Sequence, residues 1–298
     1  MARVELLKEG LALVDSGPLH ATIMVSRRER PLSEVAIEGG RYALKILEQL
    51  AAFLPVIRRK SVTLRPESDY PEVVREMILA TQAVEASDFT PLAAVAGTTA
   101  DMVADYLLKT DATRIVVDNG GDISIRLREG EEIKVGLCLD LSRREIDYAL
   151  PVEDDCGICT SGIGGRSFTL GVANAVIVLA GRASVADAAA SYLGNKTTLD
   201  SPNVERDWAE RIYPDTDIPG KRVTVSVGTL SEAEIQQALG SGQKEALRLI
   251  NSGTIRGAVI CVKDSVLPLG IFLHKIRRLQ KGTACPRGGD SLQAKERF

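Results

Sequence analysis

Three short segments of the sequence combine residue types that can bind or activate a ligand. The first, 94–105 (AVAGTTADMVAD), places Gly97 where a helix begins or bends and carries Asp101 and Asp105 one turn apart. Exposed amides at such a place can hold an anion, and carboxylates on one face can hold a cation. The same pattern is typical of a small-residue helix that packs closely on a neighbour and leaves its aspartates in solvent.

The second segment, 183–192 (ASVADAAASY), carries a carboxylate and a hydroxyl at helical spacing. Asp187 and Ser191 are four residues apart, so both oxygens project from one helical face. Mg²⁺ favours one or two hard oxygen ligands from the protein, together with substrate phosphates and water. An aspartate near a helix start can equally serve the helix dipole.

The third segment, 156–166 (CGICTSGIGGR), contains a Cys-x-x-Cys pair followed by hydroxyls and glycines. Cys156 and Cys159 could form a redox dithiol or half of a zinc site. The sequence has no second such pair, and its two histidines are His20 and His274, which argues against a four-ligand structural zinc. The glycines would let backbone amides approach a phosphate, although a plain loop between two strands explains them as well.

Composition excludes several classes of function. The 37 basic and 40 acidic residues give a net charge of -3, so the chain lacks the positive excess of a nucleic-acid binder. Its most apolar run, 173–180, is far shorter than the roughly twenty residues of a membrane-spanning helix. The charged segment 1–10 does not resemble a signal peptide, and no nucleophile-elbow serine is present. We therefore expect a cytoplasmic protein with reduced cysteines and no membrane or nucleic-acid partner.

Periodicity predicts an α/β (α+β) fold. We expect helices over 33–54, 71–85, 91–108 and 184–193, two short helices within 231–251, and a basic helix over 271–281. We expect strands over 19–30, 61–65, 133–139, 145–152, 173–180, 222–227 and 255–263, and a hairpin formed by 114–118 and 123–127. The Asn-Gly pair at its turn favours positive φ angles. Residues 1–281 should form a single folded unit, with two lobes left open, and 282–298 a mobile tail.

Four segments, taken in order, resemble the landmarks of the ApbE-like family of flavin transferases. They are AVAGTTADMVAD (94–105), NGGDISI (119–125), CTSG (159–162) and ADAAAS (186–191). In that family a glycine-rich helix start, a Gly-Gly-Asp turn, a Thr-Ser-Gly loop and an Ala-Asp-Ala-x-x-Thr helix recur in this order. The resemblance covers about residues 90–193 and looks closest to a side branch found mostly in anaerobes.

The resemblance implies a T-fold-like, two-lobed single domain with mixed or antiparallel sheets and packed helices. It implies FAD or another flavin nucleotide as ligand, Mg²⁺ on its phosphates, and transfer of the flavin mononucleotide moiety to a protein threonine. Carried over to this sequence, the metal ligands are Asp187, Ser191 and the backbone carbonyl around Ala96. The residues expected to line the nucleotide are Gly97, Thr98, Asn119, Gly120, Gly121, Asp122, Thr160, Ser161 and Gly162.

The sequence departs from the family pattern at three places. Small or acidic residues near Ala100 and Asp101 replace a family lysine, and 162–174 contains neither the histidine nor the proline of the family's His-x-x-x-Pro segment. The segment 1–10 does not resemble the signal or lipid anchor of exported members. These departures indicate a retained pocket for metal and phosphate with altered transferase chemistry.

Two other functions remain open at this stage. The scaffold could handle thiols or sulfur, with Cys159 or Cys156 as nucleophile, because this branch has been associated with sulfur amino-acid synthesis. It could instead be a non-catalytic interaction protein. The catalytic candidates are therefore Asp187 and Cys159, the ligand is nucleotide-like, and a protein substrate and a homo-oligomer are both compatible with the sequence.

Overall fold

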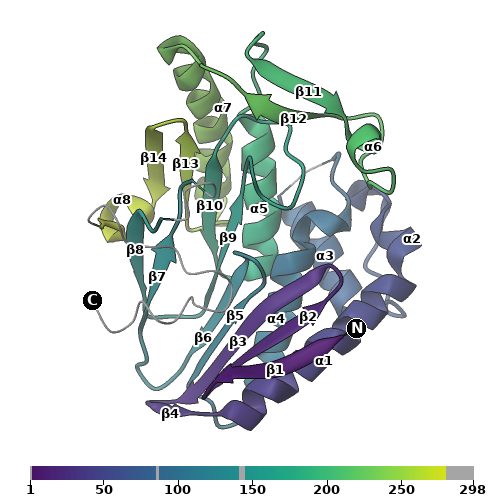
Figure 1. Ribbon diagram of the computed structural model, residues 1–298, viewed down its shortest axis with the longest axis vertical. Helices are drawn as coiled ribbons and strands as arrows, with labels where there is room; N and C mark the ends of the chain where they lie inside the picture. The colour runs from purple at the N-terminus through teal and green to yellow at the C-terminus, as the bar shows by residue number, and fades with distance from the viewer. Residues whose placement is uncertain (1, 85–86, 141–144, 280–298) are drawn as a thin grey trace.

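A large antiparallel sheet organises the chain, whose computed structural model describes residues 2–84, 87–140 and 145–279. Within these residues it has ten strands in the order β1-β2-β3-β5-β6-β9-β10-β13-β14, and β4 pairs with β3 (Figure 1). Its strands are β1 (Arg3–Lys8), β2 (Leu11–Ser16), β3 (Leu19–Arg27), β4 (Arg30–Pro31), β5 (Arg114–Asp118), β6 (Ile123–Leu127), β9 (Cys156–Ser161), β10 (Ala175–Ala180), β13 (Gly257–Val262) and β14 (Ser265–Gly270). The α+β fold with antiparallel sheets is therefore as predicted.

Smaller sheets accompany this sheet in the described residues. A second sheet contains β7 (Ile133–Leu137), β8 (Tyr148–Val152) and β15 (Arg277–Arg278). A separate ribbon contains β11 (Val204–Trp208) and β12 (Arg222–Val227). The ribbon is joined to the loop between β9 and β10, because the Thr224 amide donates to the Thr169 carbonyl at 2.8 Å.

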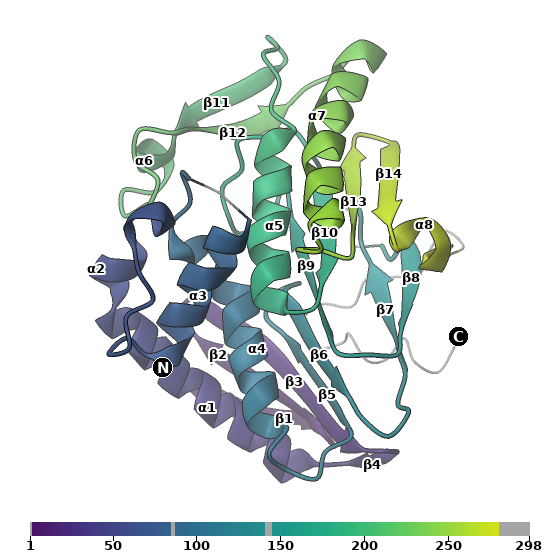
Figure 2. The same cartoon turned by 180° about the vertical axis from the view of Figure 1, so that it is seen from behind.

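The long helices cover one face of the large sheet (Figure 2). The helices are α1 (Ser33–Ala52), α2 (Leu54–Ile57), α3 (Glu72–Ala83), α4 (Val95–Leu107), α5 (Ala183–Lys196), α6 (Ala209–Ile212), α7 (Glu232–Asn251) and α8 (Phe272–Lys275), with 3-10 turns η1 (Ser61–Thr63) and η2 (Pro91–Ala94). One apolar cluster joins α1, α3 and α4 to β2, β3 and β5, and another joins α5 and α7 to β9, β10 and β13. A third lies on the opposite face, under β7, β8 and α8. Because β10 is buried on both faces, its sequence is continuously apolar.

Two predicted elements are wrong because tertiary contacts decide them. Residues 61–65 form η1 and not a strand: the Ser61 amide donates to the Phe89 carbonyl at 2.7 Å, outside any sheet. Residues 231–251 form one helix, α7, instead of two. The glycines of α7 do not interrupt the helix, because tertiary packing holds it together. Gly242 lies against β13, and a Cβ on Gly242 would lie 2.8 Å from Ile260 Cδ1.

The predicted basic helix over 271–281 is also wrong within its described part. The helix α8 ends at Lys275, and Arg277 and Arg278 then pair with β8. Residues 280–281 and the predicted tail, 282–298, lie outside the described residues.

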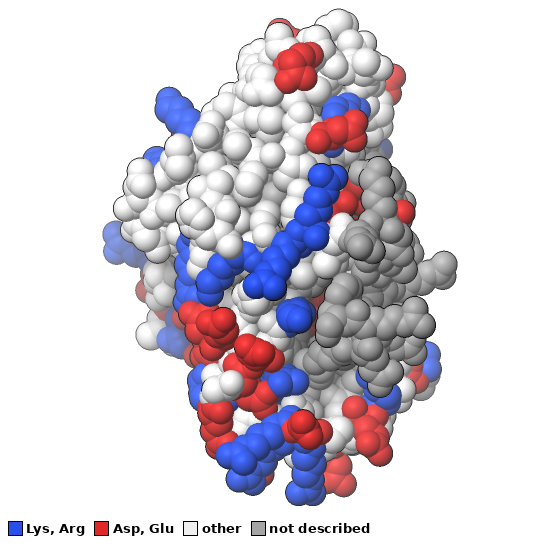
Figure 3. Space-filling view, turned by 90° about the vertical axis from the view of Figure 1, so that its left-hand side faces the viewer, with Lys and Arg blue, Asp and Glu red and all other residues white. Residues whose placement is uncertain are grey.

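The described surface agrees with the near balance of charge. On the face shown in Figure 3, basic and acidic side chains are interspersed over the lower half, and the upper part carries few charges. In the described ranges, no helix combines the length and the apolar character that crossing a bilayer requires.

A tight contact between β9 and α5 generates the first prediction. A Cβ on Gly157 would lie 2.1 Å from the Ala183 amide nitrogen at the start of α5. We expect Gly157→Ala to lower the free energy of unfolding by about 1–3 kcal/mol, because the backbone around Ala183 must move to make room for the added methyl group. Urea denaturation measures the change. The matched control is Gly181→Ala, which meets nothing within 4 Å and should stay within about 0.5 kcal/mol of the parent. Equal stability of the two variants would contradict the prediction.

Candidate functional site

The helices α4 and α5 meet backbone to backbone at Gly97. A Cβ at this position would lie 2.2 Å from the Ala183 carbonyl oxygen and 2.8 Å from Asp187 Cβ. The Gly97 amide donates to Asp187 Oδ2 at 2.9 Å. The glycine predicted to hold a ligand anion therefore already uses its N–H to hold a carboxylate of the chain. This contact fixes Asp187 against the start of α4.

Asp101 is buried and engaged by groups from other elements. Its Oδ1 accepts from Ser124 Oγ at 2.8 Å and from Arg126 Nη2 at 3.0 Å. Its Oδ2 accepts from the Ser184 amide at 2.9 Å, which satisfies an N–H of the first turn of α5. Arg182 Nε lies 3.4 Å from the same oxygen. Asp101 therefore joins α4, β6 and α5.

Asp105 continues this network one turn later. Its Oδ1 accepts from Arg126 Nε at 2.8 Å, and its Oδ2 accepts from Arg182 Nη1 at 2.7 Å. The possibility that Asp101 and Asp105 hold a cation is not realised, because two arginines already neutralise them. The alternative of solvated aspartates is wrong for Asp101, which is fully buried. No role for Arg126 or Arg182 could be predicted from local patterns, since their partners come from distant segments.

The turn between β5 and β6 brings further polar groups to this place. Gly120 and Gly121 have φ angles of 72° and 100°, as the Asn-Gly pattern predicted. Asn119 Nδ2 donates to the Ala96 carbonyl at 3.3 Å, which joins the turn to the start of α4. Asn119 Oδ1 and Asp122 Oδ1 are buried and have no hydrogen-bond partner among the described residues. Such atoms require a water, a ligand hydroxyl or a cation.

The carboxyl groups of Asp187 and Asp122 both have raised pKa values. Burial raises the pKa of Asp187 to about 7, although the Gly97 and Ala96 amides and the charge of Arg166 oppose the shift. Burial, followed by the charge of Asp187, raises the pKa of Asp122 well above its usual range. Carboxylates in such a setting favour either a proton or a metal ion. We call Asp187, Asp122 and Asn119 the carboxylate site.

The carboxylate site suits a hard cation better than zinc. In residues 2–84, 87–140 and 145–279, no group of three or more His, Cys, Asp and Glu side chains could hold a metal. Mg²⁺ needs only one or two carboxylates and completes its shell with phosphate and water. Asp187 and the unpartnered oxygens of Asp122 and Asn119 fit that requirement. Ser191 lies one turn further along α5 and is half-buried, so its role as a ligand stays a prediction.

The other predicted lining residues differ in how accessible they are. Thr98 is fully buried, and its hydroxyl has no hydrogen-bond partner among the described residues. Thr160 and Ser161 are half-buried at the end of β9, and the Thr160 amide lowers the pKa of Asp122, which places it beside that carboxylate. Gly162 is buried, and a Cβ there would lie 2.4 Å from the Asn174 carbonyl oxygen. Their contact with a nucleotide stays a prediction.

The segment with the two cysteines is a strand and not a loop. Residues 156–161 form β9, which pairs with β6 and β10. Residues three apart on a strand point to opposite faces, and Cys156 and Cys159 accordingly belong to different apolar clusters. The dithiol and half-zinc hypotheses therefore fail on geometry.

Neither thiol has the setting of a nucleophile. The Cys159 thiol is buried and donates to the Ala183 carbonyl at 3.2 Å. Burial, with the charges of Asp122 and Asp187, raises its pKa well above the usual range, and burial raises that of Cys156 to about 12. Activated cysteines have lowered pKa values and partial exposure. The structure therefore opposes the interpretation of Cys159 as a catalytic nucleophile.

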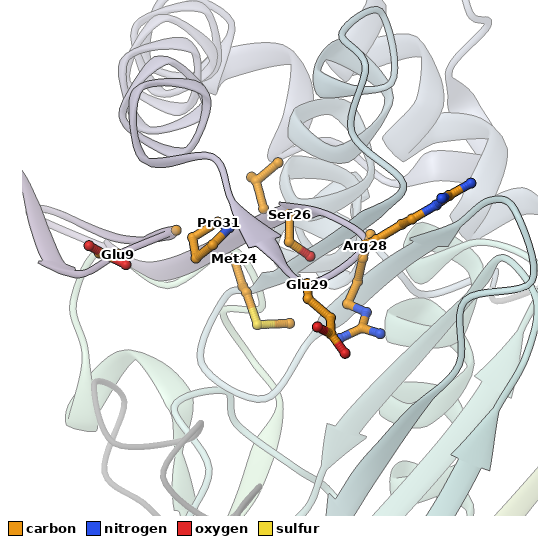
Figure 4. Close-up of a pocket in the computed structure, with 9 residues that line it drawn as sticks. Glu9, Met24, Ser26, Arg28, Glu29 and Pro31 are labelled. Carbon is orange, nitrogen blue, oxygen red and sulfur yellow. The ribbon is translucent and has the colours of Figure 1, made fainter.

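Two surface hollows lie away from the carboxylate site. One, of about 160 Å³, opens at the β3–β4 turn, where Figure 4 shows Arg28 and Glu29. Arg28 pairs with Glu129 at 3.0 Å. The other, of about 490 Å³, lies between β1 and α1. No residue selected from the sequence lines either hollow.

The raised pKa of Asp187 predicts how stability depends on pH. The folded chain keeps this proton up to about pH 7, whereas the unfolded chain loses it near pH 4. Between these values unfolding releases a proton, so the free energy of unfolding should fall as pH rises, by up to about 1.4 kcal/mol per pH unit. Asp187→Asn should remove this component in urea denaturation performed with chelator. The control Asp264→Asn, which removes an exposed carboxylate, should keep the same pH dependence as wild type. Identical pH profiles for all three proteins would refute the assignment.

The burial of Cys159 predicts slow alkylation. In the native protein Cys159 should react with iodoacetamide at least about tenfold more slowly than a cysteine in a short peptide, because little thiolate forms. In urea it should react at the peptide rate. Mass-spectrometric mapping of each cysteine gives both rates. A native Cys159 that reacts faster than the peptide would restore the thiol hypothesis.

Comparison with known proteins identifies the family of the chain. A family model described as "AbpE bacteria" matches residues 6–270. A UPF0280 protein from Methanopyrus kandleri is 35% identical over 179 residues, which are 57% of this chain and 69% of the relative. Another from Methanococcoides burtonii is 38% identical over 150 residues, 48% of this chain and 61% of the relative, so the match spans under two thirds of that protein.

Solved structures share the fold at low sequence identity. The flavin transferase ApbE from Vibrio cholerae superposes with a TM-score of 0.51 at 12% identity, over 92% of this chain and all of that one (100%). The ApbE protein from Thermotoga maritima superposes with a TM-score of 0.51 at 11% identity, over 91% and 100%. These similarities establish the fold and leave the activity to be inferred from the site.

Proposed function

Because the chain belongs to the family described as AbpE bacteria, we propose that it binds a flavin nucleotide through Mg²⁺ at the carboxylate site. The observation that carries the proposal is that Asn119 Oδ1 and Asp122 Oδ1 are buried without a described hydrogen-bond partner in the turn that contacts the start of α4, where the Gly97 amide holds Asp187. These carboxylates come from different elements, have raised pKa values, and lie beside unpartnered oxygens. A ligand that brings a divalent cation would remove the cost of holding their charges together.

Each residue of the carboxylate site would have its own role in binding the ligand. Asp187, held by the Gly97 amide, would bind the metal, and Asp122 would bind it as well or accept a proton. Asn119 Oδ1 is available to accept a hydrogen bond from a ligand hydroxyl. When bound, Mg²⁺ would neutralise phosphate charge and make the phosphorus easier to attack. Among such ligands FAD is our candidate, because the family resemblance implies it and the similar solved structure is named a flavin transferase.

Transfer chemistry is the second part of the proposal. A protein hydroxyl would form a bond to the phosphorus of the flavin mononucleotide moiety, the bond to AMP would break, and the hydroxyl proton would pass to a carboxylate. Since 162–174 contains no histidine, Asp122 is our candidate for this proton acceptor. This would be the altered chemistry that the departures from the family pattern indicate.

A titration with FAD tests the binding step. Wild-type protein should bind FAD more tightly with Mg²⁺ than with chelator, and Asp187→Asn should lose at least about tenfold of the metal-dependent affinity because one anionic ligand is gone. Asp264→Asn, an exposed carboxylate, is the matched control and should bind like wild type. Chromatographic detection of AMP from FAD then reports transfer or hydrolysis. Metal-independent binding, or none, would favour the non-catalytic interaction protein.

A further inference from the structure

Arg166 joins three segments at the edge of the sheet beside the carboxylate site. It lies in the loop between β9 and β10, and its Nη2 donates to the Asn119 carbonyl at 3.1 Å. Its Nη1 donates to the Pro18 carbonyl, in the β2–β3 turn, at 3.3 Å. The strand pairs Ser16–Leu19, Asp118–Ile123 and Ser161–Val176 close next to these three segments. The guanidinium is thus held where three strand connections meet.

The turn leaves room for this guanidinium. A Cβ on Gly120 would lie 2.1 Å from Arg166 Nη2, so any side chain there would displace it. Gly120 also has a φ of 72°, which disfavours other residues for a second reason. The absence of a side chain at Gly120 therefore determines where the charge of Arg166 lies.

The charge of Arg166 acts on the nearby carboxylates, and among the described residues Arg166 forms no ion pair that would neutralise it. It lowers the pKa of Asp118 and Asp187, although burial raises both overall. Its described hydrogen bonds go to two backbone carbonyls, which use two of the five N–H donors of an arginine. The residue is exposed, so the remaining donors can reach a ligand. Arginine is the side chain best suited to bind phosphate in this way.

We propose that Arg166 binds a phosphate group of the ligand whose metal is held at the carboxylate site. The inference rests on the proposed function and adds the residue that recognises the anion. The site then has two parts: unpartnered oxygens for a cation or a hydroxyl, and a guanidinium for a phosphate. A ligand that carries hydroxyls, phosphate and a divalent cation satisfies both parts, whereas riboflavin lacks the phosphate.

The test compares the binding of metal alone with the binding of metal and phosphate. The wild-type chain, Arg166→Gln and Arg166→Lys are titrated with Mg²⁺, with FAD in Mg²⁺ and with inorganic pyrophosphate in Mg²⁺. Arg30→Gln, which removes an exposed arginine on β4, is the control. We expect Arg166→Gln to weaken FAD and pyrophosphate at least about tenfold and to bind Mg²⁺ alone equally or more tightly, because a repelling positive charge is gone. Arg166→Lys should be intermediate for phosphate.

A purely structural role of Arg166 predicts a different pattern. Loss of the bond to the Asn119 carbonyl would then disturb the turn and weaken Mg²⁺ and phosphate together, which would overturn the inference. Unchanged FAD and pyrophosphate affinity in Arg166→Gln would overturn it too. If wild type binds pyrophosphate through Arg166 but shows no Mg²⁺-dependent FAD binding, the proposed function fails and the inference stands. Binding of neither by wild type would reject both.

Discussion

The buried carboxylate of Asp101 is the interaction on which the site depends. It accepts hydrogen bonds from β6 through Ser124 and Arg126 and from the first turn of α5 through the Ser184 amide. A buried charge is tolerated only when it is paired and its lone pairs are satisfied, and here both conditions hold. Because Asp101 fixes α5 against α4, Asp187 reaches the Gly97 amide one turn later along α5.

The aspartates around the start of α5 fall into two groups with opposite surroundings. Asp101 and Asp105 share the cations of Arg126 and Arg182. The carboxylate site has no such ion pair among the described contacts, and its pKa values are raised accordingly. The first arrangement stabilises the fold, whereas the second leaves a deficit of positive charge that only a proton or a ligand can remedy. This contrast separates a structural pair of aspartates from a functional one at nearly the same place.

The sequence could predict the site as far as local patterns determine it. The Asn-Gly pair predicted the turn at 119–122, helical spacing placed Asp187 on α5, and the resemblance placed both beside Gly97. It could not assign Asp101, because the partners Arg126 and Arg182 follow it by 25 and more residues and meet it only in the fold. Nor could it show that 156–161 is a strand, since this depends on pairing with β6 and β10. Local chemistry was predictable, and tertiary pairing was not.

The glycine contacts of α5 limit how the site can change. Gly97 on one side and Gly157 on the other bring backbone atoms against Ala183. The start of α5 is therefore closely packed on both sides and has no room to shift. Gly171 confines the other end, where a Cβ would lie 1.9 Å from the Gly194 carbonyl oxygen. Helix displacement is therefore a costly way to admit a bulkier ligand. Any change in the size of molecule accepted should arise by remodelling the exposed part of the β9–β10 connection, where Gly164 and Gly165 impose no comparable packing restraint.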